Sequence, residues 1–229
     1  MKTKAILFGS IGAVAETSEI QREAYNRALK NAGLQWEWDR ETYSELLEQA
    51  GGKERLRMLA HATGTDLDEG DIEAIHEEKT RIAGEIMRER GVSPRPGITD
   101  LIAKAREAGG KLGFVTTTYE PNIEAVFDAA GDALNREDFA YIGTRGDVSQ
   151  GKPSPECYER ALSKLGLNPG EAIAVEDTAT SVQSAKRAGI ATIATPGELT
   201  ANQDFWQADV VVERGNGEAL VREVKRIAA

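Results

Sequence analysis

Polar side chains that could hold a phosphate and a metal ion follow several apolar segments of the sequence. Thr116 and Thr117 come directly after one such segment, the pair Glu176 and Asp177 ends another, and Lys152 stands in a loop between them. In open parallel α/β sheets, ligands bind beyond the carboxyl ends of the strands, where such loops converge. A hydroxyl and a lysine can contact phosphate oxygens, and paired carboxylates can hold Mg²⁺. These residues therefore predict a site for a phosphate and a hard divalent cation.

Each of these residues also has an explanation that needs no ligand. A threonine after a strand commonly forms the turn, and Asp177 could cap the helix that follows it. A lysine before a proline, as at Lys152, is commonly a solvated surface charge. Only their combination, in this order and at one edge of a sheet, indicates a functional site.

The segments that must position these residues alternate between helix and strand after residue 96. Strands are expected at 3–8, 111–116, 138–143, 172–176, 191–195 and 209–213. Helices are expected at 98–108, 123–129, 155–165 and 181–188, with one more at the C-terminus. Apolar strands separated by helices predict right-handed βαβ units and a parallel sheet covered on both faces. The predicted fold class is α/β, a doubly wound, Rossmann-like parallel sheet.

The stretch from about residue 17 to residue 91 predicts helices only. Apolar residues recur there at helical spacing, and Asp39 and Asp71 are expected to open two of the helices. Because the strand at 3–8 belongs with the later strands, this stretch is an insertion into the sheet domain. We predict a core domain of residues 1–15 and 92–229, and an inserted α-helical cap domain of residues 16–91.

Composition narrows the classes of partner. The formal net charge of -10 argues against nucleic-acid binding, which depends on Lys and Arg neutralising phosphates. No apolar run approaches the length that crosses a bilayer. The single Cys157 excludes an internal disulfide and is typical of a reducing compartment. We expect a cytoplasmic protein that binds neither nucleic acid nor membranes.

The order of these motifs resembles that of the haloacid dehalogenase-like hydrolases with a helical cap. The segments AETSEIQREAYNRAL, VTTTYEPN, GKPSPECYERAL and AVEDTATS carry the resemblance, which extends over essentially the whole chain. The chain is most similar to the branch that contains β-phosphoglucomutase and the CbbY sugar-bisphosphate phosphatase. The resemblance implies a phosphorylated sugar or another anion as the ligand.

The resemblance also implies roles for particular residues. Contacts to phosphate or to the sugar phosphate are implied for Thr116, Thr117, Lys152, Arg55 and Lys53. Mg²⁺ coordination is implied for Glu176 and Asp177.

The first motif of the family, Asp-x-Asp-Gly after a hydrophobic strand, is absent from this chain. Gly9 occupies the position of the nucleophilic aspartate, and Ile11 that of the aspartate acting as general acid and base. Ser10 is the nearest hydroxyl, and we expect it to point to the opposite face because side chains alternate along a strand. Gln21 stands where the branch often has histidine. With one carboxylate lost, Mg²⁺ is expected to bind weakly.

Three functions remain open at this point. The first is a CbbY-type pseudoenzyme that retains a phosphosugar pocket but is catalytically impaired. The second is an active, Mg²⁺-dependent phosphoric monoester hydrolase that works by a non-standard route. The third is a non-enzymatic protein that binds a protein partner through its surface. Whether the chain is an enzyme is therefore not decided by its sequence.

Overall fold

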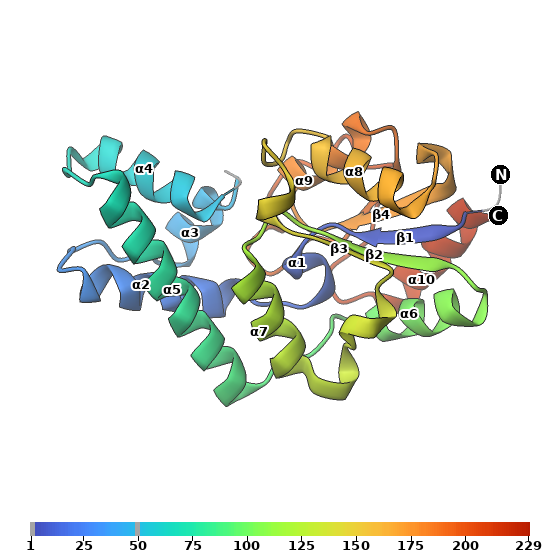
Figure 1. Cartoon of the computed structure of the whole chain (residues 1–229), viewed down its shortest axis with the longest axis horizontal. Helices are drawn as coiled ribbons and strands as arrows, with labels where there is room; N and C mark the ends of the chain where they lie inside the picture. Colours follow the sequence, from blue (N-terminus) through green and yellow to red (C-terminus); the bar gives the residue numbers. More distant parts are fainter. Residues whose placement is uncertain (1–2, 49–50) are drawn as a thin grey trace.

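A computed structural model describes residues 3–48 and 51–229, and these residues form a six-stranded parallel sheet (Figure 1). The strands are β1 (Ala5–Phe8), β2 (Lys111–Val115), β3 (Tyr141–Gly143), β4 (Ala172–Glu176), β5 (Ala191–Ala194) and β6 (Val210–Val211). Their order in the sheet is β3-β2-β1-β4-β5-β6. The chain winds outward from β1 in both directions, so the predicted doubly wound α/β fold is confirmed.

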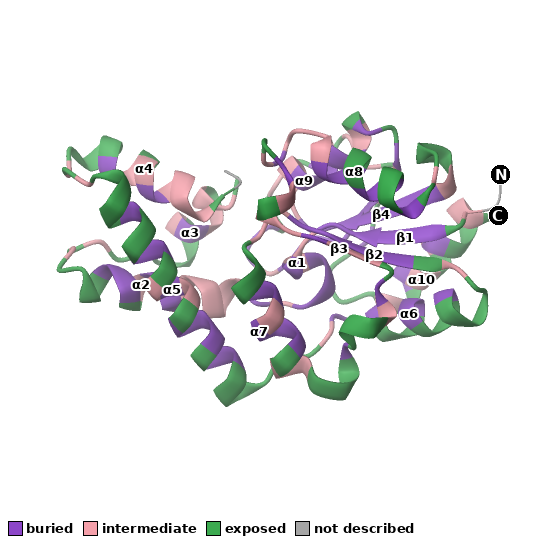
Figure 2. Ribbon diagram, viewed as in Figure 1, coloured by how far each residue is buried: buried purple, intermediate pink, exposed green. Residues whose placement is uncertain are grey.

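Strand β1 lies at the centre of the sheet and shows why both faces must be covered. All four of its residues are buried, and they alternate between two hydrophobic clusters. Ile6 and Phe8 pack on one face, whereas Ala5 and Leu7 pack on the other. Figure 2 shows the central strands buried between two layers of helices. This alternation is the period of two that a strand imposes on its side chains.

The core helices lie on both faces of the sheet. Helices α8 and α9 contact one face, and α6 and α10 contact the other (Figure 1). The core helices are α1 (Ile11–Val14), α6 (Ile98–Glu107), α7 (Glu120–Ala130), α8 (Glu156–Leu165), α9 (Ala179–Arg187) and α10 (Gly217–Ala228). Short 3₁₀ turns occur at Gly131–Ala133, Arg136–Asp138, Arg145–Asp147 and Pro169–Glu171.

A group of helices projects from one end of the sheet layer (Figure 1). Its members are α2 (Ser18–Asn31), α3 (Arg40–Leu46), α4 (Gly52–Thr63) and α5 (Glu69–Arg90). Tyr25, Trp38 and Tyr43 form its aromatic centre, with ring centroids 4.6 to 6.1 Å apart, and all three are almost fully buried. The division into a core and a cap domain stays a prediction, and residues 1–2 of the core range and 49–50 of the cap range lie outside the described part.

Two connecting segments join this helical group to the sheet, and Arg95 ties them together. Ala15 and Pro94 form an isolated antiparallel bridge between the segments. The buried Arg95 guanidinium donates to the carbonyl oxygens of Gly12 (2.9 Å), Thr195 (2.6 Å) and Pro196 (2.6 Å). The same arginine thus holds the first connection, the second connection and the loop after β5.

Several boundaries differ from those predicted. The strand expected at 138–143 begins only at Tyr141, because Asn135 caps a 3₁₀ turn over residues 136–138. The strand expected at 209–213 is reduced to two residues at the edge of the sheet. Asp39 caps α3 as predicted, but α5 is opened by Asp68, and Asp71 is the third helical residue of a capping box.

No helix within 3–48 or 51–229 is long and apolar enough to span a membrane.

Candidate functional site

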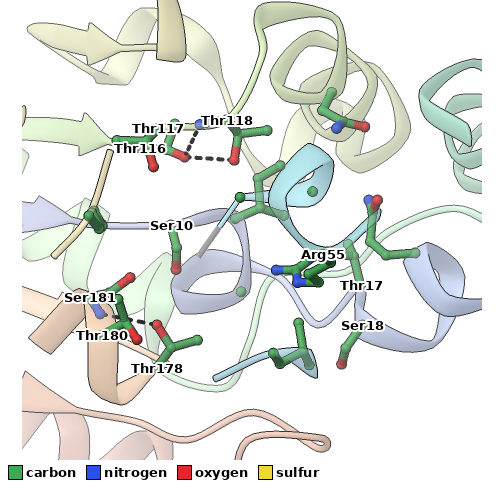
Figure 3. A pocket seen from close by; sticks show the side chains of 18 of the residues that line it. Ser10, Thr17, Ser18, Arg55, Thr116, Thr117, Thr118, Thr178, Thr180 and Ser181 are labelled. Carbon is green, nitrogen blue, oxygen red and sulfur yellow. Dashed lines mark hydrogen bonds between the residues drawn. The ribbon is translucent and has the colours of Figure 1, made fainter. Parts of the chain in front are cut away.

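A cavity of about 500 Å³ lies between the carboxyl ends of the strands and the helical group. Figure 3 shows hydroxyl-bearing side chains of the core, among them Ser10, Thr116 and Thr178, on one side and Arg55 on the other. The predicted site residues that line the cavity are Thr116, Thr117, Lys152, Asp177, Arg55 and Lys53. Glu176 is not among the lining residues. The fold therefore gathers most of the predicted residues, although their roles stay predictions.

Lys152 and Glu176 form a buried ion pair. The Lys152 ammonium lies 2.7 Å from Glu176 Oε1 and also donates to the carbonyl oxygen of Gly9. The Tyr158 hydroxyl donates to the same Glu176 Oε1 at 2.6 Å. Only 3% of the Lys152 side chain and none of the Glu176 side chain is exposed. The charge that was expected to face a phosphate is thus already matched by an internal carboxylate.

This ion pair fills the space that a side chain at position 9 would occupy. A Cβ atom on Gly9 would lie 2.0 Å from Glu176 Oε1 and 2.1 Å from the Tyr158 hydroxyl oxygen. Non-bonded heavy atoms normally stay about 3.5 Å apart. A side chain at position 9, which the resemblance aligns with the family's nucleophile, would therefore have to displace Glu176 and Tyr158.

Asp177 does reach the cavity, where it contacts Ser10. The Ser10 hydroxyl donates to Asp177 Oδ1 at 2.5 Å and accepts from the backbone of Ala13 at 3.0 Å. The expectation that Ser10 points away is wrong, because β1 ends at Phe8 and the alternation of a strand no longer applies. Asp177 does not cap the next helix either, because the N-cap of α9 is Thr178, whose side chain accepts a hydrogen bond from Ser181 N.

Burial disfavours the charged forms of both acids at the end of β4. It raises the pKa of Glu176, an effect that the Lys152 charge opposes and the nearby Asp177 augments. Burial also raises the pKa of Asp177, against the hydrogen bond from Ser10. The pKa of Tyr158 lies well above its ordinary value, mainly because of burial, so the phenol keeps its proton and donates a hydrogen bond to Glu176.

These residues do not fit a magnesium centre. Mg²⁺ prefers an octahedral set of oxygen ligands, but Glu176 turns its Oε1 to Lys152 and Tyr158 and does not line the cavity. In the part of the chain that the structure describes, no three His, Cys, Asp or Glu side chains are grouped so that they could hold a metal ion. Of the two predicted ligands only Asp177 lines the cavity, and the other lining carboxylates are already engaged, Glu16 by the backbone N–H groups of Ser18 and Glu198, and Glu54 by Arg57.

The threonines after β2 form a tight turn. The Thr116 hydroxyl donates to the Thr118 hydroxyl at 2.8 Å and accepts from the Thr118 backbone at 3.0 Å. The turn explanation is thus correct for Thr116, but all three hydroxyl-bearing residues of this turn also line the cavity. Neutral hydrogen-bonding groups therefore cover this wall.

The predicted residues of the helical group approach the cavity from α4. Lys53 pairs with Glu73 and lies 4.6 Å from the centroid of the Tyr119 ring. Arg55 donates from Nε to the carbonyl oxygen of Leu46 at 2.8 Å. The His76 ring packs on the same tyrosine, with its centroid 5.3 Å from that of the Tyr119 ring. Tyr119 thus connects the core to the helical group at the cavity wall.

Lys79 is a site residue that the sequence analysis missed. It lines the cavity, is only 4% exposed, and lies 4.8 Å from the centroid of the Tyr25 ring. No acidic side chain among the described residues pairs with it, and burial lowers its pKa to about 7. Burial and nearby cations lower the pKa of His76 to about 3, so this imidazole is neutral at pH 7. A lysine in the apolar register of α5, with Ile72, Ile75, Ile82 and Ile86, was the available signal.

Comparison with known proteins bears on the whole chain. A profile described as haloacid dehalogenase-like hydrolase matches residues 3–189. Protein CbbY of Cereibacter sphaeroides is 42% identical over 211 residues, which are 92% of this chain and 91% of that protein.

Solved structures agree with this comparison. The crystal structure of CbbY from Rhodobacter sphaeroides in complex with phosphate has a TM-score of 0.86 and 40% identity, over 93% of this chain and 94% of that one. A mutant of the same CbbY in complex with Xylulose-(1,5)bisphosphate matches with the same TM-score, identity and coverage.

Proposed function

The chain belongs to the haloacid dehalogenase-like hydrolases, in their CbbY-type branch, and we propose that it binds a phosphorylated sugar without cleaving it through an aspartyl-phosphate. The observation that carries this proposal is the closed space beside Gly9. Covalent phosphoryl transfer needs a nucleophile that can reach the phosphorus atom. In this chain Glu176 and Tyr158 occupy that place, and Lys152 is turned toward them.

The cavity itself supports binding of such a ligand. Its volume of about 500 Å³ falls in the range of small-molecule sites. Hydroxyl groups of the core and cations of the helical group face the same space. The CbbY neighbour whose structures contain phosphate and Xylulose-(1,5)bisphosphate shares 40% of its sequence with this chain. A phosphorylated sugar is therefore the ligand class that we assign.

We expect Mg²⁺ to contribute little to this binding. The predicted ligand Glu176 is engaged by Lys152 and Tyr158, so Asp177 is the one predicted ligand that lines the cavity. Affinity measured with millimolar Mg²⁺ and affinity measured with EDTA should agree within about threefold, since the other lining carboxylates, Glu16 and Glu54, are held by backbone N–H groups and by Arg57, respectively.

Binding and phosphate release must be measured on the same preparation. Sugar mono- and bisphosphates are titrated calorimetrically, and inorganic phosphate is assayed in parallel with Mg²⁺ present. The expected result is saturable binding, with no more phosphate release than from Lys152→Met. Circular dichroism verifies that this variant is folded.

Two outcomes would contradict the proposal. Phosphate release by the unaltered chain that disappears in Lys152→Met would establish an active hydrolase. Absence of binding by any sugar phosphate, with a folded chain, would leave the partner-binding alternative.

A further inference from the structure

Three of the described residues that line the cavity are lysines, and two of them are paired with acids. Lys53 pairs with Glu73, and Lys152 lies 2.7 Å from Glu176. Lys79 forms no ion pair within the described parts of the chain. We infer that Lys79 is a nucleophilic amine that forms an imine with the open-chain carbonyl group of a bound sugar phosphate. The inference rests on the proposed function and specifies the ligand class further.

The surroundings of Lys79 favour the uncharged form of its amine. The titratable groups near it are Tyr25 of α2, Arg55 of α4 and His76 of α5 itself, and none of them is an acid that is charged at pH 7. Burial, and then the Arg55 charge, lower the pKa of Lys79 to about 7. The Tyr25 ring, whose centroid lies 4.8 Å away, is the one group that attracts an ammonium here. About half of the Lys79 amines are therefore neutral at pH 7, and about nine-tenths at pH 8.

A neutral amine has the lone pair that an attack on a carbonyl carbon requires, whereas an ammonium does not. Removing a lysine from water or placing it beside another cation activates it in this way. The burial of Lys79 and the Arg55 charge provide both conditions. Lys53 and Lys152 differ, because a carboxylate beside a lysine favours its protonated form. The structure therefore distinguishes one reactive amine among the three lysines of the cavity.

Some sugar phosphates carry a carbonyl group that no ring can mask. In Xylulose-(1,5)bisphosphate, which the structure of the CbbY mutant contains, the oxygen that would close a five-membered ring on the ketone is esterified with phosphate. The ketone of this compound therefore stays open and electrophilic. When a cavity of about 500 Å³ holds the amine and the ketone together, their reaction becomes effectively intramolecular. The ligand class is thus a sugar phosphate with an unmasked carbonyl.

The reaction needs no oxidant or reductant. The nitrogen lone pair of Lys79 forms a bond to the carbonyl carbon, and the π electrons of the C=O bond move to the oxygen. One proton passes from nitrogen to that oxygen and gives a carbinolamine. The oxygen then leaves as water with the second proton of the amine, and a C=N bond remains. Addition of water reverses the sequence, and the phosphate esters stay intact throughout.

Reductive trapping tests the inference. The unaltered chain is incubated at pH 8 with Xylulose-(1,5)bisphosphate and cyanoborohydride, which adds hydride to the imine carbon and makes the new C–N bond permanent. Peptide mapping by mass spectrometry should find the adduct on Lys79 at least about tenfold more often than on Lys53 or Lys152, because the carboxylates beside those two favour their protonated forms. Lys79→Met should lose the adduct. The matched probe is the pentitol bisphosphate obtained by reducing the ketone beforehand, and it should give no adduct.

Calorimetry on the same preparation separates this inference from the proposed function. Saturable binding of the bisphosphate without an adduct on Lys79 would overturn the inference and leave the proposed function standing. An adduct found equally on Lys53, Lys152 or surface lysines would overturn it as well.

If calorimetry detects no binding, the proposed function fails, and glycolaldehyde replaces the bisphosphate as a carbonyl probe without phosphate. Preferential labelling of Lys79 by glycolaldehyde would support its reactivity independently of the sugar phosphate. Labelling of Lys79 no faster than that of the other lysines would show that its amine is not activated.

Discussion

Gly9→Ala is the smallest change that tests whether Glu176 and Tyr158 close the nucleophile position. The added methyl group would lie 2.0 Å from Glu176 Oε1, 2.1 Å from the Tyr158 hydroxyl and 2.2 Å from Glu176 Cδ. To restore a contact of about 3.5 Å, the carboxylate must retreat by about 1.5 Å. Glu176 has no exposed surface into which it can move, and two donors hold its Oε1.

The expected loss of stability follows from those contacts. Overpacking a close-packed interior costs about 1–3 kcal/mol. Losing one hydrogen bond to a charged group costs about 1.5–3 kcal/mol more. Replacing glycine by alanine stabilises the folded state by about 0.4–1 kcal/mol, because it lowers the conformational entropy of the unfolded chain. The free energy of unfolding should therefore fall by about 2–5 kcal/mol.

Denaturant unfolding at pH 7 measures this loss, with Gly151→Ala as the matched control. Gly151 also lines the cavity, but a Cβ placed there meets no atom within 4 Å. Its replacement should change stability by no more than about 1 kcal/mol. In a double-mutant cycle, Gly9→Ala should cost about 2–3 kcal/mol less in a Glu176→Ala background, because the competing carboxylate is gone. The reasoning is refuted if Gly9→Ala costs no more than Gly151→Ala and costs the same in both backgrounds.

Two further predictions concern buried cations. Burial lowers the pKa of Lys79 from 10.5 to about 7. Between these two pH values Lys79 is therefore more protonated in the unfolded chain than in the folded chain. The free energy of unfolding rises with pH over this range and falls as the pH falls toward 7. In denaturant titrations, the difference in free energy of unfolding between Lys79→Met and the unaltered chain should shrink by about 2 kcal/mol from pH 7 to pH 9. A difference that does not change with pH would contradict the lowered pKa of Lys79. Arg95→Ala leaves three carbonyl oxygens without their donor, so thermal and denaturant unfolding should show a loss of about 3–5 kcal/mol. The exposed Arg106→Ala should change stability by about 0.5 kcal/mol or less, and equal losses for the two arginines would rule out a structural role for Arg95.

The sequence predicted the fold and the approximate position of the site. Apolar segments alternating with helices required a parallel sheet, and the ends of parallel strands meet at one edge. This rule placed Thr116 and Asp177 in one cavity although 61 residues separate them in the chain. The lack of a carboxylate at Gly9 and at Ile11 was also evident from the residues alone. The short strands β3 and β6 were predicted too long, because a turn cap and an edge position override local propensity.

Three features of the site depended on tertiary structure. Ser10 faces the cavity because β1 ends two residues earlier, which strand alternation could not foresee. Lys79 becomes a buried cation only because α5 packs on α2 and places it over the Tyr25 ring.

The filled space beside Gly9 is the third feature and the one on which the proposed function rests. Glu176 and Tyr158 lie on β4 and α8, far along the chain from Gly9, and each alone resembles an ordinary polar residue. Sequence spacing specifies which residues a strand end or a helix face presents. It does not specify which side chains fill the space beside a glycine, because that choice depends on close packing and on pairing charges away from water.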